Sequence, residues 1–391
     1  MMSDRLLDEG DDYFEIEPSA TMNILAAIES HQKSGGASYQ EVAISDALSM
    51  EDTQESVKAI NAIVKRTDNM LEQTAKTISQ DKMVQPIRTA IDTRLASLRR
   101  SARSATASYH PVAAIGDFAS MAKATEEQRL NNSFFVDVSG GYQKNDSRKE
   151  HVLSTNLGFD NVMSIENGRM VLGGALSLTK VDNSDTGMSD DGMMYSLTGY
   201  LSYEQKQGFE LQSYLTAGYL VNDRSMMPEI NLGEQTFDER SWMLMSSNYF
   251  KYHFRAGNLS IRPMAIVDLG WSEVSESEST YFKRDNLTER TVDLGLGVEI
   301  EGSHESIGYL FQVTARRNVY NSADSIGVNL KNAQGYISYD LENRHETTFG
   351  ANAMVSKRIM QNMILDVGAG ATASTDGSLG VNGNARLRYL F

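Results

Sequence analysis

From Phe134 to the C-terminus, apolar and polar residues alternate with a period of two in one segment after another. In the last segment Val381, Leu387 and Tyr389 share one parity, whereas Asn384 and Arg386 share the other. Successive side chains of a β-strand point to opposite faces of its sheet, so this period predicts strands with one apolar and one polar face. The polar rows contain Arg, Asp, Asn, Ser and Gly, which is typical of a hydrated interior.

We count twelve such segments, which start near residues 134, 151, 170, 192, 209, 239, 259, 288, 306, 346, 362 and 379. The connections after every second segment are tight, whereas those at 223–238, 275–287 and 319–345 are long and polar. Short turns at one end and longer loops at the other are typical of outer-membrane barrels, which close so that every backbone group has a partner in hydrocarbon. The predicted fold is an all-β transmembrane barrel of twelve antiparallel strands, preceded by an α-helical linker or plug segment.

The composition narrows the function classes further. The chain has 391 residues, a net charge of -16 and no cysteine, which excludes disulfides, cysteine-ligated zinc and iron–sulfur clusters. No basic stripe is available to neutralise phosphates, so nucleic acid is not an expected partner. No apolar run approaches about 18 residues, which excludes a transmembrane helix.

A change of composition near residue 131 separates the alternating part from what precedes it. Before it, apolar residues recur at helical spacing, and Pro86 suits the first turn of a helix that we place at about 86–102. This helix bears Arg88, Arg94 and Arg99. The predicted regions are an acidic tail (1–20), a helical junction that includes this helix (21–130) and the barrel (131–391).

Aromatic residues are expected near the ends of the strands, where they form girdles at the two membrane interfaces. The residues assigned to these girdles are Tyr200, Tyr203, Tyr219, Trp242, Tyr249, Tyr252, Trp271 and Tyr389.

Three stretches resemble parts of the translocator domain of autotransporters, the type V secretion family. The last nine residues, Gly383–Phe391 (GNARLRYLF), resemble the C-terminal strand of that domain. Ile91–Arg99 resembles the helix that lies inside its pore, and Phe134–Val138 resembles the start of its first strand. The resemblance covers roughly residues 21–391, and it depends on the order and spacing of these stretches, since no single motif is highly specific.

The resemblance implies a secretion device in the outer membrane of a Gram-negative-type cell. A passenger N-terminal to the barrel would be exported and anchored at the cell surface, and the acidic tail would be the remnant of that passenger's end. The helix would then plug the lumen. The inward-facing carboxylates that we expect to pair with it are Asp137, Asp268, Asp293, Glu299 and Asp366.

The resemblance also implies partners. Tyr389 and Phe391 would form the signal that the barrel-assembly machinery reads. Outer-membrane lipid and lipopolysaccharide would surround the barrel, and we expect a monomer. Some members of the family release their passenger at an Asn–Asn pair in the plug helix, where this chain has Thr89 and Ala90. We therefore predict that the passenger stays attached or is released in another way.

The start of the chain is also unusual for the family, because no signal peptide and almost no passenger precede residue 21. We expect a C-terminal fragment, a trimmed chain or a misassigned start.

Other chemistry finds little support in the residues. The six histidines are scattered, there is no Gly-x-Ser-x-Gly elbow, and the loop at 182–187 lacks the last acid of a calcium loop. We therefore expect no catalytic residue, no cofactor and no metal. Two alternatives stay open at this point: a porin-like channel with a soluble helical domain, and an outer-membrane enzyme with its site in the outer loops.

Overall fold

The computed structural model describes two parts of the chain. It describes residues 132–391 apart from 146–147, 186, 228–233, 257–258, 281, 305–306, 332–335, 342–344 and 361, and before them only Leu71, Thr74, Arg88, Ile91, Asp92, Arg94 and Leu95. These seven earlier residues are helical. The predicted acidic tail, Arg99 and most of the predicted junction lie outside the described residues. No helix among the described residues is long and apolar enough to cross a membrane.

The strands are β1 (Asn132–Asn145), β2 (Arg148–Ile165), β3 (Gly168–Asp185), β4 (Met188–Gln205), β5 (Phe209–Met226), β6 (Gln235–Tyr252), β7 (Phe254–Ala256), β8 (Leu259–Val274), β9 (Ser277–Glu278), β10 (Phe282–Arg284), β11 (Leu287–His304), β12 (Ile307–Asn321), β13 (Ser325–Leu330), β14 (Ile337–Asp340), β15 (Thr347–Met360), β16 (Met363–Ser374) and β17 (Leu379–Leu390).

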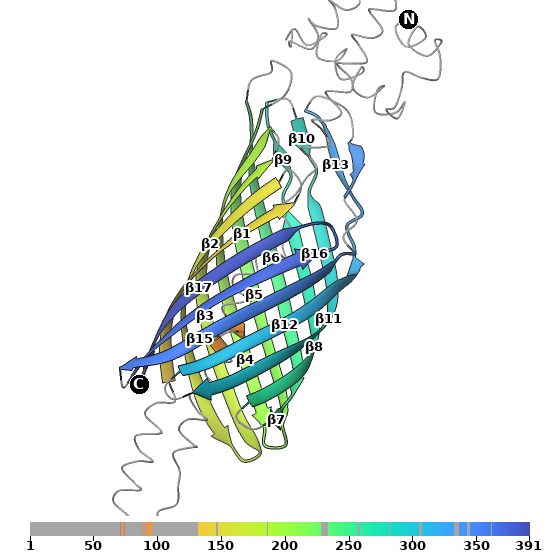
Figure 1. The fold of residues 1–391 in the computed structure, drawn as a ribbon. Coiled ribbons are helices and arrows are strands. Elements are labelled where there is room, and N and C mark those ends of the chain that lie inside the picture. The colour runs from red at the N-terminus through yellow and green to blue at the C-terminus, as the bar shows by residue number, and fades with distance from the viewer. Residues whose placement is uncertain are drawn as a thin grey trace, which may run out of the picture.

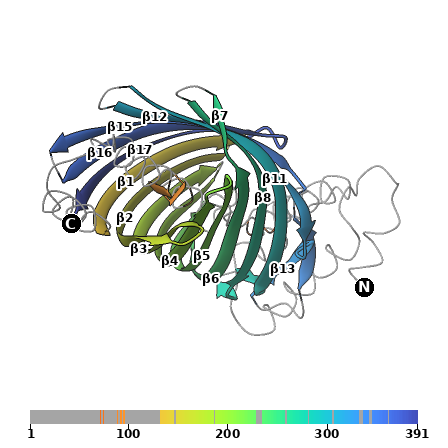
Figure 2. The same ribbon diagram turned by 90° about the horizontal axis from the view of Figure 1, so that it is seen from below.

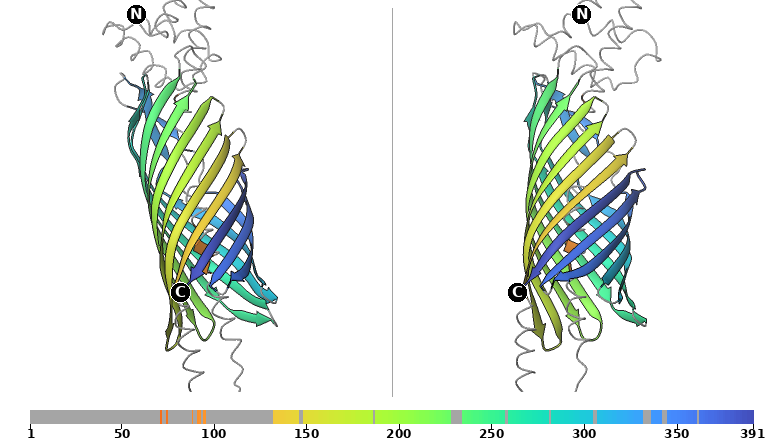
Figure 3. Two further views of the ribbon diagram at one scale, coloured as in Figure 1. Left: turned by 90° about the vertical axis from the view of Figure 1, so that its left-hand side faces the viewer. Right: turned by 60° about the vertical axis from the view of Figure 1, so that its left-hand side comes forward.

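Twelve of these strands form a closed barrel. They are β1–β6, β8, β11, β12 and β15–β17, each antiparallel to its neighbours, and the β17–β1 and β8–β11 pairings complete the ring (Figure 1; Figure 2). The prediction of a twelve-stranded antiparallel barrel is therefore confirmed. The predicted and observed starts differ most for β4 and β6, which begin at Met188 and Gln235, four residues before the predicted positions. The strands are long and strongly tilted (Figure 3).

The loop end of the barrel contains more strand than the sequence predicts. Residues 223–238 were expected to be a loop, but β5 continues to Met226 and β6 starts at Gln235, because the alternation persists beyond the membrane. The other two long connections contain β9, β10, β13 and β14, which pair into a separate four-stranded sheet at this end (Figure 1). The opposite end has only short connections, and the C-terminus lies there (Figure 1).

A row of aspartates marks the outer edge of the lipid-facing band. Asp182, Asp191, Asp223 and Asp238 are directly paired across β3, β4, β5 and β6. On β6 the outward residues from Trp242 to Tyr252 are mostly apolar, and this stretch matches the roughly ten residues that a tilted strand needs to cross the bilayer. Carboxylates cannot lie in hydrocarbon at low cost, so the strand ends beyond this row project into water.

Two of the predicted girdle residues face the lumen. Tyr200 and Tyr249 are 4% and 0% exposed, so the prediction that they belong to the aromatic girdles is wrong. A residue near the end of a strand can face either the lumen or the lipid, because the face alternates from one residue to the next. Trp242 does point outward, and its ring lies 4.5 Å from that of Tyr219, centroid to centroid.

Gly158 of β2 provides room for an aromatic ring on the lumen side. A Cβ atom at this position would lie 2.2 Å from Phe135 Cζ and 2.8 Å from the carbonyl oxygen of Gly174. Gly199 of β4 is a matched position on the outer face, where a Cβ atom would meet nothing within 4 Å. The close approach of the Phe135 ring therefore requires glycine at position 158. The packing around position 199 sets no such requirement.

We predict that Gly158→Ala destabilises the barrel by about 1–3 kcal/mol, because the ring of Phe135 must move. Gly199→Ala should not lower the free energy of unfolding, because a Cβ atom there meets nothing and alanine loses less backbone entropy than glycine on folding. Urea unfolding of the two refolded variants in detergent, followed by heat-modifiable electrophoretic mobility, measures both effects. Equal stabilities would contradict the packing argument.

Candidate functional site in the barrel lumen

The inner wall of the barrel contains buried ion pairs at several levels. Near the loop end, Arg224 Nε lies 2.6 Å from Asp190 Oδ1. Near the short-turn end, Arg262 Nη1 lies 2.8 Å from Glu299 Oε1, and Lys251 Nζ lies 2.9 Å from Glu299 Oε2. These side chains are almost fully buried, so each pair offsets a charge that would otherwise lack a partner.

The helical residue Arg94 is bound at the seam between the first strands. Its Nε atom donates to Asp160 Oδ2 on β2 at 2.7 Å, and its Nη2 atom donates to Asp160 and to Ser133 on β1. The guanidinium carbon lies 5.0 Å from the centroid of the Phe135 ring. Arg94, Asp160 and Phe135 are completely buried, so this is a charge-assisted contact shielded from water.

A second group of contacts holds the helix higher in the lumen. Arg88 Nη2 lies 3.7 Å from Asp268 Oδ2 on β8, and it donates to the sulfur of Met245 at 3.1 Å. Asp92 Oδ2 accepts a hydrogen bond of 2.7 Å from the hydroxyl of Tyr249 on β6. Both charged side chains of this helical turn therefore contact polar or charged groups of the wall.

A third contact lies at the loop end. Arg224 Nη1 donates to the carbonyl oxygen of Thr74 at 3.5 Å, and the hydroxyl of Thr74 donates to the sulfur of Met226 at 3.8 Å. Thr74, Arg88 and Arg94 thus contact the wall at successive levels from the loop end towards the short-turn end. Figure 2 shows the helical residues inside the ring of strands.

The lumen is less polar than the sequence predicts. Ile91 and Leu95 of the helix join one buried apolar cluster with side chains of the wall, among them Met243, Met245 and Tyr249. Unbranched methionines can fit irregular gaps around a helix. Sequence reasoning missed this cluster because parity shows which methionines face the lumen but not which helical side chains they contact there.

The predicted lumen partners divide into two groups. Asp268 lies beside Arg88 of the helix, as given above. The others contact strand residues: Asp137 binds Arg386 (3.1 Å), Asp366 binds Arg388 (2.9 Å), Glu299 binds Lys251 and Arg262, and Asp293 accepts a hydrogen bond from Asn318 (2.7 Å). The ion pairs of the helical residues Arg88 and Arg94 are with Asp268 and Asp160.

Asp160 is the functional residue that the sequence analysis missed. It lies on the inward parity of β2, together with Asn156 and Gly158, so the alternation alone could have identified it as a lumen carboxylate. The alternation could not predict that Asp160 pairs with Arg94, because this contact depends on how deeply the helix lies in the barrel.

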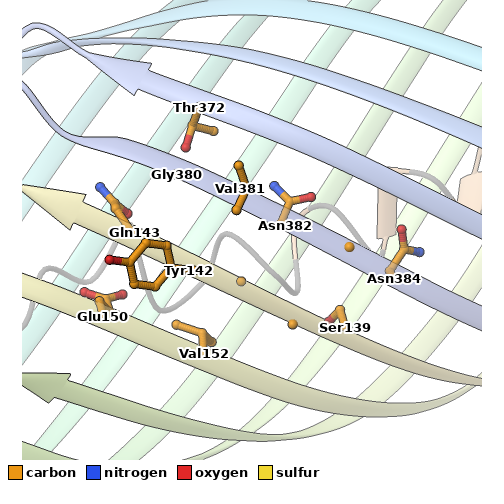
Figure 4. Close-up of a pocket in the computed structure, with 13 residues that line it drawn as sticks. Ser139, Tyr142, Gln143, Glu150, Val152, Thr372, Gly380, Val381, Asn382 and Asn384 are labelled. Atoms are coloured by element: carbon orange, nitrogen blue, oxygen red, sulfur yellow. The ribbon is translucent and has the colours of Figure 1, made fainter.

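A pocket lies on the lumen side of the seam between β1, β2, β16 and β17 (Figure 4). Glycines at 140, 141, 380 and 383 are among its lining residues. Glu150 is the single carboxylate among its lining residues. Within the described part of the chain no three carboxylates or histidines are placed to hold one metal ion.

The fold and the lumen define a class of protein: an outer-membrane barrel whose pore contains a helix from the chain's own N-terminal side. The family model of the C-terminal domain of the vacuolating cytotoxin autotransporter VacA matches residues 70–391, and the chain belongs to this family. It is thus an autotransporter translocator domain of the Gram-negative outer membrane, and it exports an N-terminal passenger. The family is a transport domain, and neither the channel nor the enzyme alternative is favoured.

Solved structures agree on the fold. The translocator domain of the autotransporter NalP from Neisseria meningitidis is 11% identical, with a TM-score of 0.55, and the match covers 77% of this chain and 98% of that chain. The β domain of the Bordetella autotransporter BrkA is 16% identical, with a TM-score of 0.52, and the match covers 67% and 100%. No curated protein matches the sequence significantly.

We predict that Asp160→Asn weakens the docking of the helix by about 3–5 kcal/mol, because Arg94 then lacks its buried counter-charge. The control is Asp182→Asn, whose pair with Lys180 (3.3 Å) is about half exposed and should contribute roughly 0–1 kcal/mol. Urea unfolding midpoints of the complete chain in detergent compare the two variants. Equal shifts would show that the contact of Arg94 does not stabilise the plugged state.

Proposed function

We propose that the lumenal helix is the segment at which export ends, and that it then anchors the passenger while it closes the pore. The order of contacts along the lumen carries this proposal. Thr74 lies at the loop end, Arg88 lies below it, and Arg94 lies near the short-turn end, where β1 begins. Longer loops face outward in outer-membrane barrels, so Thr74 lies towards the cell exterior and Arg94 towards the periplasm.

The contacts of the helix also support a stable anchor. Withdrawal of the helix would separate Arg94 from Asp160 and Arg88 from Asp268, and it would expose Ile91 and Leu95. Breaking one buried ion pair typically costs about 3–5 kcal/mol. A passenger joined to this helix would therefore stay at the surface unless the chain were cut, which agrees with Thr89 and Ala90 at the positions where some relatives cleave.

The domain organisation and partners belong to the same proposal. An acidic tail (1–20), a helical junction (21–130) and a barrel (131–391) would follow each other, and the barrel itself would carry no catalysis. Lipid and lipopolysaccharide would surround the outer face. The assembly machinery would read the C-terminal aromatic residues, which are half exposed on the outer face, with the rings of Tyr389 and Phe391 stacked at 6.2 Å.

We predict that a signal peptide and an epitope fused before Thr21 bring the epitope to the surface of intact cells, where added protease removes it. The matched control inserts the same epitope in the short connection between β11 and β12, where it should stay protected. Antibody labelling and proteolysis of whole cells measure both. A protected N-terminal epitope on a correctly assembled barrel would refute the export orientation.

We predict that Phe391→Ala reduces the amount of barrel assembled in the outer membrane severalfold, whereas Phe391→Tyr keeps most of it. Either variant keeps the backbone bond from Phe391 N–H to the carbonyl of Asn132 (3.1 Å), so the comparison isolates the ring. Heat-modifiable barrel in membrane fractions is the measurement. Unchanged assembly of the alanine variant would argue against an aromatic assembly signal.

A further inference from the structure

The wall forms a binding site around the Nε and Nη2 atoms of the Arg94 guanidinium. Asp160 supplies the carboxylate, Ser133 accepts from Nη2, and the ring of Phe135 lies 5.0 Å from the guanidinium carbon. The three residues belong to β1 and β2. A planar cation with several N–H donors satisfies such a set of groups, whereas a compact ammonium ion cannot form the same fork.

This site is organised by the wall itself. The hydroxyl of Ser133 donates to Asp160 Oδ1 at 2.6 Å, and the hydroxyl of Tyr200 on β4 donates to Asp160 Oδ2 at 3.1 Å. The ring of Phe135 is seated over Gly158, as described above. None of these contacts involves the helix, so the carboxylate and the ring keep their positions when the helix is absent.

The described wall residues at this level include more buried carboxylates than buried arginines. Asp137 and Asp366 form ion pairs with the buried wall arginines Arg386 and Arg388, whereas the ion pair of the buried Asp160 is with Arg94. Arg386 lies against Phe135, with its guanidinium carbon 5.6 Å from the ring centroid. Arg94 supplies a further cation here, and its contact with Ser133 of β1 places it beside the β17–β1 seam.

We propose that Ser133, Phe135, Asp160 and Tyr200 form a guanidinium receptor in the barrel wall, which binds an alkylguanidinium ligand when Arg94 is removed. The binding itself follows from the geometry of the wall. Its role rests on the proposed function: arrival of Arg94 in the receptor sets the register at which the exported chain stops and the pore closes.

The test uses the complete chain with Arg94→Ala, which removes the atoms beyond Cβ, and ethylguanidinium, which replaces those atoms. In planar bilayers the variant should conduct severalfold more than the unsubstituted chain. Millimolar ethylguanidinium should lower this conductance in a saturable manner and raise the urea unfolding midpoint. Ethylammonium at the same concentration should do neither.

Two control variants separate the receptor from unspecific block of the pore. Arg94→Ala combined with Asp160→Asn should conduct as the single variant does but should not respond to ethylguanidinium. Arg88→Ala should not respond either, since Arg94 still occupies the receptor in that variant. An equal response of all three variants, or no response of Arg94→Ala, overturns the proposal.

If Arg94→Ala does not assemble, Arg94→Lys provides the same test, because lysine keeps the charge and loses the fork. It should conduct more than the unsubstituted chain, and ethylguanidinium should compete with it. Display of the N-terminal epitope is measured separately in cells. A saturable response without display would refute the proposed function and leave the receptor intact, whereas display without the response would refute only the receptor.

Discussion

Closure of the sheet is the constraint on which this structure depends. In hydrocarbon an unpaired backbone N–H or C=O group costs several kcal/mol, so a sheet can span the membrane only as a ring. The β17–β1 pairing runs over twelve residue pairs from Ser133–Leu390 to Lys144–Leu379, and the β8–β11 pairing closes the opposite side. Everything in the lumen, including the helix, is arranged inside a wall that this pairing holds together.

The closed wall imposes a second requirement, because it encloses the charges of its inward rows. Arginines such as Arg262 and Arg386 are buried, and each lies beside carboxylates of neighbouring strands. The helical arginines are also buried beside carboxylates of the wall: Arg88 lies beside Asp268, and Arg94 lies beside Asp160. Electrostatic matching therefore selects where the helix rests, while the apolar contacts of Ile91 and Leu95 add stability without strong directional preference.

Much of the fold could be predicted from the sequence because alternation is a local property. All twelve barrel strands were expected, and the outward positions of Leu387 and Tyr389 follow directly from their parity. Errors arose where a local signal was ambiguous. Tyr200 and Tyr249 were assigned to the girdles from their place near strand ends, although their parity directs them into the lumen. The small sheet of β9, β10, β13 and β14 joins two separate loops, and no local pattern reports that pairing.

The sequence alone determined which residues of each strand face the lumen, since a period of two leaves only two faces. It thereby determined that Asp137, Asp268 and Asp366 are lumen carboxylates. Only the tertiary structure decided their partners. Arg94 and Asp160 are 66 positions apart, and their meeting depends on the register of β1 against β2 and on the depth of the helix. Both are properties of the closed barrel, because a shift of one strand by two residues preserves every face and changes every neighbour.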